Sequence, residues 1–469
     1  MKRARWWIVV GVACCAVGFG HAANLPAQEE TGDDLTELVV GLLSDADKDI
    51  RALGLEQVRT QAKGKAATRA FAAQLPKLPT DAQVGLLRAL ADRGDDAARP
   101  GVLELLKSSG DESVRVAAIA AVGAVGESGD AALLIERLRG NNKAEQAAAR
   151  KSLQRLRGDE VGKSICTALE TKDAGIPLRV ALIEILAERG EKSALDNLLS
   201  AAISDDQRVR TAAMAALGKL AEPEQVAGMV RGVLAADSSA ERSAAEKCIM
   251  FVCHRVNDAD HQADALIAAI EQLKPDERAA MLSTLGRVGG AKALVRVEAA
   301  IAAEDAKLRD LGIRALCNWP TAAVAGRLTD LANIAEAPEH RTMVLRALIR
   351  VAPLSDERTD EQRLALLGKA MSMSQRDEER NLVLNRTRAV RTVEALRFLL
   401  PYMENAELAE TACESIVELA HHRALRDANK AEFHAALDKV IATSKDVVVV
   451  DRANRYKKGQ TWVRPKPAS

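Results

Sequence analysis

The chain has 469 residues, and its 66 Lys and Arg are balanced by 66 Asp and Glu, so the formal net charge is zero. Without a basic surplus, we expect no binding to nucleic acid or anionic lipid through bulk charge. Aromatic residues are only 2% of the sequence, which argues against surfaces that stack on sugars or bases and leaves Ala, Leu, Val and Ile to build the core.

Residues 1–22 are predicted to be a secretory signal peptide. Three cations within the first five residues precede an apolar run over 6–19, and Gly20-His21-Ala22 places small residues where signal peptidase cleaves. Retention in the membrane by an uncleaved signal segment is the alternative, although the run is shorter than the roughly 20 apolar residues that span a bilayer. We expect an exported protein, periplasmic or extracellular, with a short linker over 23–34.

A polar residue recurs about every 32 residues through most of the chain. Successive spacings are 31 to 33 residues except for one of 36, and such a period predicts a stacked array of similar units. The recurring residues, called anchors below, are Arg51, Gln83, Arg115, Gln146, Arg179, Arg210, Arg242, Arg278, Arg309 and Arg341. The seventh residue after each anchor is apolar: Val58, Leu90, Val122, Leu153, Leu186, Leu217, Ile249, Leu285, Leu316 and Leu348. This recurring apolar position independently supports the 32-residue repeat.

Each unit is predicted to be a helical hairpin. Gly94, Gly126 and Gly190 follow the first helix where a left-handed cap would end it. A second amphipathic segment comes next, as over 131–138 and 263–273. Aspartates two to five residues before the anchors suit the start of the first helix: Asp49, Asp81, Asp111, Asp205, Asp237, Asp276 and Asp305.

The ends of the array are less regular. Two further units have anchors near Arg376 and Ala409, and a helix over 35–43 is expected to cover the first hairpin. Segments 431–444 and 447–456 are predicted to close the array, because terminal repeats meet water on one side. The sequence therefore predicts an all-α array over 35–445, followed by a cap and basic tail over 446–469.

The run from Asp111 to Gly126, with Val114-Arg115, Ala117-Ala118 and Ala121-Val122-Gly123 inside it, resembles HEAT repeats of the short, bilin-lyase-like type. The resemblance covers roughly residues 35–440 and, with the signal segment, suggests an exported bacterial member. It implies an α-solenoid of about twelve HEAT-like hairpins, in which the repeated Arg pairs with an Asp of the adjacent repeat. Such arrays usually act as binding scaffolds, so we expect a non-enzymatic protein that binds another protein, with no cofactor. A fold does not by itself carry a function.

A metal- or haem-bearing redox protein is the alternative. Cys248 and Cys253 are followed directly by His254, as c-type haem attachment requires, although four residues separate the thiols and both lie in a repeat helix. Other repeats have Ala or Gly at the places of Cys248 and Cys317, which predicts that these thiols are small core residues.

A second candidate for metal binding lies near the C-terminus. Glu414, Glu418 and His422 share one helical stripe, and Glu418 with His421 has the spacing found in di-iron bundles. No second motif of this kind is present, so a solvated polar face is the favoured interpretation and no metal ligand is assigned. Deoxyhypusine hydroxylases, which share the repeat, hold iron through His-Glu pairs, and this chain has no such pair.

Partner contacts are expected where the repeats differ, because residues present in every unit usually stabilise the structure of the repeat. One such place is the long spacer over 235–278. Another is Trp319, for which burial against the next hairpin is the alternative. The remaining candidates are a cationic cluster and two aromatic residues near the C-terminus: Arg380, Arg386, Arg388, Arg391, Arg397, Tyr456 and Trp462. The cluster suits an acidic protein or polymer, unless it is a solvated face interleaved with acids.

Overall fold

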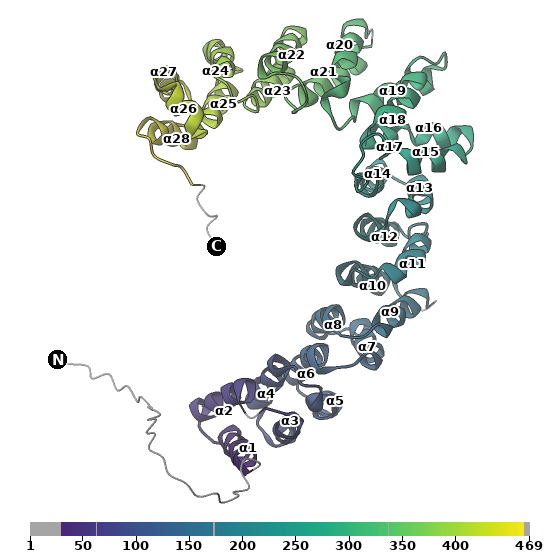
Figure 1. Ribbon diagram of the computed structural model, residues 1–469, viewed down its shortest axis with the longest axis vertical. Coiled ribbons are helices and arrows are strands. Elements are labelled where there is room, and N and C mark those ends of the chain that lie inside the picture. The colour runs from purple at the N-terminus through teal and green to yellow at the C-terminus, as the bar shows by residue number, and fades with distance from the viewer. Residues whose placement is uncertain (1–29, 62, 172–173, 336, 464–469) are drawn as a thin grey trace, which may run out of the picture. The chain divides into compact units, whose positions relative to one another are not determined.

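The computed structural model describes residues 30–463 except 62, 172–173 and 336 (Figure 1). This part of the chain is helical and contains no strand. Within it, no helix is long and apolar enough to cross a membrane. The predicted signal peptide, the linker up to residue 29, and Arg464 and Lys466 of the tail lie outside the described residues. The chain divides into two compact units, residues 1–158 and 159–469.

The first unit is a stack of antiparallel helices. Its helices are α1 (Glu30–Leu43), α2 (Lys48–Thr60), α3 (Lys65–Ala72), α4 (Thr80–Arg93), α5 (Arg99–Ser108), α6 (Glu112–Val125), α7 (Ala131–Arg139) and α8 (Lys143–Arg155). Helices α2, α4, α6 and α8 form one layer in which each packs on the next. Helix α1 packs on α2 and α3, as expected for a helix that covers the first hairpin, but it begins at Glu30 rather than Leu35. The last residues of the predicted linker are therefore helical.

The second unit continues the same alternation of helices. Its helices are α9 (Glu160–Glu170), α10 (Ile176–Arg189), α11 (Leu195–Ala201), α12 (Gln207–Leu220), α13 (Val226–Leu234), α14 (Ser239–Cys253), α15 (Asp264–Glu271), α16 (Pro275–Ala280), α17 (Leu282–Val288), α18 (Ala291–Ile301), α19 (Ala306–Cys317), α20 (Ala325–Ile334), α21 (Pro338–Val351), α22 (Asp360–Met373), α23 (Asp377–Thr387), α24 (Val393–Leu399), α25 (Ala409–His421), α26 (Arg423–Ala428), α27 (Lys430–Thr443) and α28 (Val447–Lys457). Helices α10, α12, α14, α17, α19, α21, α23 and α25 pack in that order in one layer.

Short 3₁₀ helices join several of these elements. They are η1 (Leu75–Lys77), η2 (Asp96–Ala98), η3 (Ser128–Asp130), η4 (Lys192–Ala194), η5 (Pro223–Gln225), η6 (Ala322–Val324) and η7 (Leu400–Glu404). Counted in chain order within the described residues, twelve helical pairs follow α1, with α26 inside the last pair and α28 after it. The predicted all-α solenoid of about twelve hairpins is confirmed.

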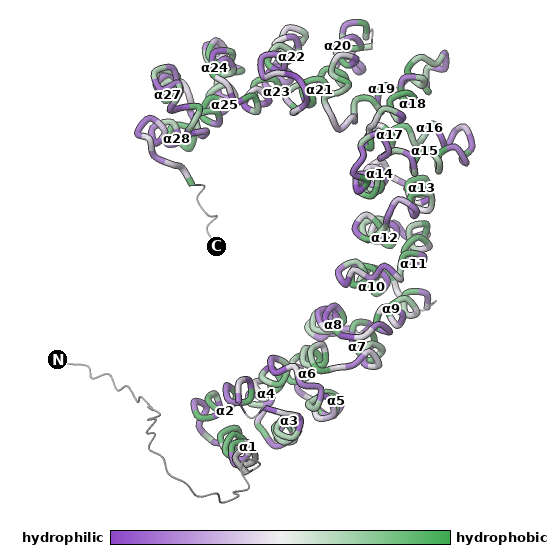
Figure 2. Tube along the Cα trace, in the orientation of Figure 1, coloured by the Kyte–Doolittle hydropathy of each residue, from purple (hydrophilic) through white to green (hydrophobic). Residues whose placement is uncertain are grey.

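The apolar position seven residues after each anchor forms the spine of the core. All ten of these side chains, and the equivalents Val383 and Ile416 in the two less regular units, expose no more than 2% of their surface. Burying one such Val, Leu or Ile stabilises the fold by about 1.5–3 kcal/mol. Figure 2 shows hydrophobic and hydrophilic residues interleaved along the helices, as expected when each helix buries one face.

The helix ends agree only in part with the predictions. Gly94 and Gly190 end α4 and α10 with φ values of 66° and 72°, in the left-handed region. Gly126 has a φ of −77° instead, and glycine is needed there because a Cβ would collide with the carbonyl oxygen of Val122.

The helix starts also depart from the predictions in places. Asp111 and Asp305 cap their helices as predicted, each accepting hydrogen bonds from two backbone amides. Helices α12 and α14, in contrast, are capped by Asp206 and Ser238, one residue after the predicted aspartates.

The repeat with the 36-residue spacing is irregular. Its first helix is predicted to be continuous, but it is interrupted at Met281, so that α16 and α17 take the place of one helix. This distorted repeat is bordered by α15 and α18, and two adjoining surface pockets lie beside it.

Candidate binding surfaces of the second unit

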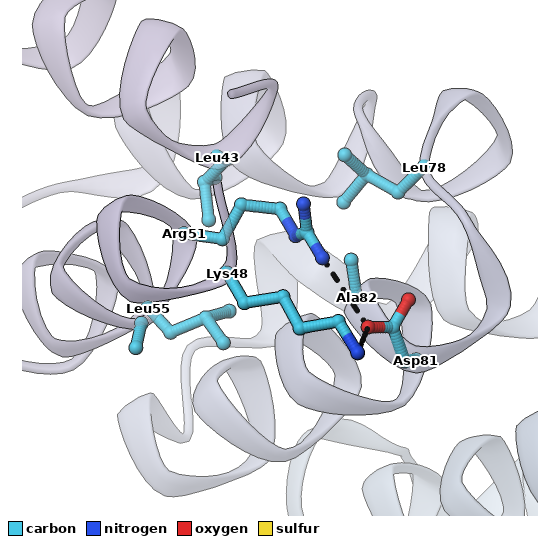
Figure 3. A pocket seen from close by; sticks show the side chains of 8 residues that line it. Leu43, Lys48, Arg51, Leu55, Leu78, Asp81 and Ala82 are labelled. Atoms are coloured by element: carbon cyan, nitrogen blue, oxygen red, sulfur yellow. Dashed lines mark hydrogen bonds and ion pairs between the residues drawn. The ribbon is translucent and has the colours of Figure 1, made fainter. Parts of the chain in front are cut away.

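Three of the repeated arginines, Arg51, Arg115 and Arg210, join their repeat to the next one. Nη1 of Arg51 donates to the carbonyl oxygens of Asp45 and Ala46, each at 2.9 Å, and Nη2 donates to Asp81 of the next repeat at 3.2 Å. Figure 3 shows this guanidinium beside a cavity of about 100 Å³, with the Lys48 ammonium also directed at the Asp81 carboxylate. The side chain thus satisfies carbonyls that precede its own helix and neutralises a carboxylate of the following repeat.

The same arrangement occurs with glutamate in place of aspartate. Nε of Arg115 lies 2.7 Å from Glu145, and Nε of Arg210 lies 2.7 Å from Glu241. The hydrogen bond to Glu241 raises the pKa of Arg210 despite the opposing effect of burial. The expected pairing with an Asp is therefore too narrow, because either carboxylate fits. These arginines hold the array together and are not available to a partner.

The five arginines of the cationic cluster fall into two groups, those that pair with a carboxylate of the protein and those that do not. Nη1 of Arg380 lies 3.0 Å from Asp377, and Arg397 makes a bidentate pair with Glu432 at 2.7 and 2.8 Å. Such bonds satisfy the guanidinium groups within the protein. Arg380 and Arg397 therefore have carboxylate partners already.

The other three arginines lie in and just after the last turn of α23. Arg386 and Arg391 are exposed, and Arg388 is half-buried. Within the described residues their side chains make no hydrogen bond or ion pair. Thr387 and Val390, both fully buried, fix the backbone that carries them. Residues 386–391, called the cationic turn below, thus present three unpaired positive charges.

Polar side chains of α25, and His422 directly after it, lie near the cationic turn. The pKa of His422 is lowered, first by burial and then by the positive charges of Arg391 and His421. The pKa of Glu414 is raised by burial and by neighbouring carboxylates, against the effect of Arg388. The structure therefore brings the cationic turn and the predicted polar stripe of α25 together, which their separation in sequence did not reveal.

Two of the candidate metal-binding residues, Glu418 and His421, are engaged with α28. Nη1 of Arg452 donates to Glu418 at 2.7 Å, and this hydrogen bond lowers the pKa of Glu418 although burial opposes it. Nδ1 of His421 lies 2.9 Å from the hydroxyl oxygen of Tyr456. In the part of the chain that the structure describes, no three His, Cys, Asp or Glu side chains are grouped as metal ligands would be.

The haem candidate is engaged in packing between helices. Cys253 is 1% exposed, and burial raises the pKa of its thiol to about 12. Cys248 packs against α12, where a Cβ on Gly218 would lie 3.1 Å from the Cys248 Cβ. Nε2 of His254 lies 2.8 Å from the carbonyl oxygen of Val288. The thiols are the small interhelical residues that the repeat positions predict.

The aromatic candidates need correction. Trp319 is 2% exposed and Tyr456 is 1% exposed, so neither ring offers a surface to a partner. The backbone of Trp319 is held as well, because its carbonyl oxygen accepts a hydrogen bond from Arg350 at 2.7 Å. Trp462 is half-buried, and its ring centroid lies 4.8 Å from the guanidinium carbon of Arg452, as in a cation–π contact. Of the three, only Trp462 keeps accessible surface.

Two adjoining pockets border α16 in the irregular repeat. One, of about 740 Å³, is lined by polar and charged residues of α14, α17 and α19, including Arg242 and Lys307. The other, of about 410 Å³, is mainly apolar. Pro275 and Leu308 line both. The long spacer signalled this place in the sequence, but the lining residues could not be named from it.

Comparison with known proteins agrees with this architecture. A model of HEAT repeats matches residues 68–154 and 164–250. No curated protein sequence matches the chain.

Solved structures also resemble the chain at low identity. A Kap121p structure shares 13% identity, with a TM-score of 0.49 over 92% of this chain and 57% of that one. Yeast importin-beta (Kap95p) shares 12% identity, with a TM-score of 0.42 over 89% of this chain and 62% of that one. Human deoxyhypusine hydroxylase in complex with glycerol shares 16% identity, with a TM-score of 0.25 over 62% of this chain and 97% of that one. The chain thus spans little more than half the length of Kap121p, and likenesses at this level say nothing about what it binds. The chain thus contains HEAT repeats over residues 68–154 and 164–250, and the helical hairpins beyond them carry the same apolar positions.

Proposed function

We propose that this protein is a non-enzymatic scaffold, in the cell envelope or outside the cell, that binds an acidic segment of another protein at the cationic turn. The observation that carries the proposal is the set of three arginines, Arg386, Arg388 and Arg391, without hydrogen bonds or ion pairs in the described residues. Export rests on the signal segment of the sequence alone.

The chemistry of the turn favours a carboxylate-bearing partner. A guanidinium presents several N–H donors in a rigid fork that matches a carboxylate. Arg397 shows this geometry with Glu432 of the protein itself, through Nε and Nη2. Of the two acids of α25 near the turn, Glu418 is already hydrogen-bonded to Arg452, and Glu414 makes no hydrogen bond or ion pair with Arg388 in the described residues. An acidic segment would supply the carboxylates that the turn lacks.

Charge reversal tests the proposal. A labelled polyglutamate peptide is titrated with the protein, and binding is followed by fluorescence anisotropy. The triple variant R386E/R388E/R391E should bind at least about tenfold more weakly, because three charge-assisted contacts become repulsive. Binding to the unaltered protein should weaken as salt is added, since exposed charges are screened.

A matched variant controls for net charge. K107E/K143E/K151E makes the same change in charge at three exposed lysines of the first unit and should bind like the unaltered protein. Equal weakening in both variants, or undiminished binding by R386E/R388E/R391E with an unchanged circular dichroism spectrum, would contradict the assignment to the cationic turn.

A further inference from the structure

The apolar pocket of the irregular repeat has the lining of a small-molecule site. Its volume is about 410 Å³, within the range of roughly 300–1,000 Å³ that ligand pockets occupy. Ile267 and Ile270 of α15, Leu282 of α17 and Leu308 of α19 contribute aliphatic side chains. Ala300 of α18 lines it as well. Such a lining suits a flexible aliphatic chain, which gains by leaving water.

Three charged residues also line the pocket, and two of them neutralise each other. Arg296 and Glu271 form an ion pair through Nη2 and Oε1. The third, Arg278, donates from Nε to the carbonyl oxygen of Leu273 at 2.7 Å. Its Nη1 and Nη2 atoms make no hydrogen bond or ion pair with the described residues. One unpaired guanidinium edge therefore lies at an otherwise neutral, apolar pocket.

Leu308 stands where the carboxylate partners of two other anchors stand. The anchors Arg51 and Arg115 each pair with an acid thirty residues later. Thirty residues after Arg278 stands Leu308, which lines the pocket instead. At Arg278, as at Arg309, no acid of the next repeat pairs with the anchor in the described residues, and at Arg278 an aliphatic side chain lines the pocket instead.

We propose that this pocket binds an aliphatic carboxylate, a free fatty acid. The hydrocarbon chain lies against Ile270, Leu282 and Leu308, and the carboxylate accepts hydrogen bonds from Nη1 and Nη2 of Arg278. The ligand supplies an apolar chain that matches the pocket lining and a negative charge that Arg278 lacks. The site is separate from the cationic turn, so either can fail without the other.

Calorimetric titration with dodecanoate, below its micellar concentration, tests the site. Dodecyltrimethylammonium has the same chain with a positive headgroup, and acetate has the carboxylate without the chain. Dodecanoate should bind measurably and at least about tenfold more tightly than either, because it alone has both an apolar chain for the lining and a carboxylate for Arg278.

Two variants test the Arg278 contact and the apolar space of the pocket separately. R278Q removes the charge and should weaken dodecanoate binding about tenfold. A299F fills the pocket from an exposed position of α18 and should abolish binding. The matched controls are R309Q, whose guanidinium bonds only to the carbonyl oxygens of Ala303 and Glu304, and A291F at another exposed alanine of α18. Both should bind like the unaltered protein.

Several results would overturn the proposal. These are no binding of dodecanoate, equal binding of the two dodecyl probes, and unchanged affinity in R278Q or A299F. Circular dichroism of each variant shows that it is folded, so a loss of binding reports on the pocket itself.

Discussion

Arg210 shows how much a single side chain contributes to the array. It is 4% exposed, lies on α12, and bonds to Glu241 and Asp237 of the next repeat as well as to the carbonyl oxygen of Ser204. Glu241 is itself buried, and the Arg210 guanidinium donates hydrogen bonds to both of its carboxylate oxygens. The pair therefore fixes the position of α12 against α14.

Replacing Arg210 tests this role. R210M should lower the free energy of unfolding by about 2–4 kcal/mol, because a carboxylate is left buried without its partner. The double variant R210M/E241L should recover most of the loss. Urea unfolding followed by circular dichroism measures both.

Arg208 provides the control, two residues earlier on the same helix. Its side chain pairs with Asp206 but is 68% exposed, so R208M should have a much smaller effect. Equal effects of R208M and R210M would show that burial of the pair is unimportant.

At the scale of helices, glycine sets how closely neighbouring first helices approach. A Cβ on Gly123 would lie 2.6 Å from the Ser152 Cα, and a Cβ on Gly286 would collide with the carbonyl group of Ala315. Each of these contacts joins a first helix to the next one, α6 to α8 and α17 to α19. The close approach explains why only small residues suit these positions.

Gly286 and Gly326 allow a matched comparison. G286A should destabilise the protein by about 1–3 kcal/mol, because the backbone of α19 cannot move away without cost. Gly326 is exposed on α20 with no atom within 4 Å of the added Cβ, so G326A should stabilise by about 0.5–1 kcal/mol. Thermal unfolding measures both changes. A neutral G286A would mean that the helices separate freely at this contact.

At the scale of the whole molecule, stability is distributed along the stack. Within each unit every hairpin packs on its immediate neighbours, so no single central core exists. The first and last hairpins need covers, and helices α1 and α28 lie against them. Local regularity alone can build such an array, which is why the 32-residue period was a sufficient guide to the fold.

Export is the prediction that belongs to the whole molecule. When the full chain is expressed in a bacterium, mass spectrometry should find a mature protein that begins at Ala23 in the envelope or medium. A22R should block cleavage, because signal peptidase requires a small residue there. An intact N-terminus on protein confined to the cytosol would refute export.

Much of the fold and little of the candidate site could be predicted from residues. The hairpins and the apolar spine were predictable because they depend on residues a few positions apart. Trp319 and Tyr456 were predicted to contact a partner because they stand where the repeats differ, yet both are buried among helices. Arg386 and Arg397 look alike in sequence, and only the second meets a carboxylate, Glu432, from a later helix.

The sequence by itself determined the repeat, its boundaries within a few residues, and the small size of the thiol positions. Tertiary structure alone decided which arginines are paired, which aromatic rings are buried, and where a pocket opens beside α16. The physical reason is the separation in sequence between the residues that contact each other. A helix forms from contacts within one or two turns, whereas pairing, burial and pocket shape depend on side chains about thirty residues apart that meet only when hairpins stack.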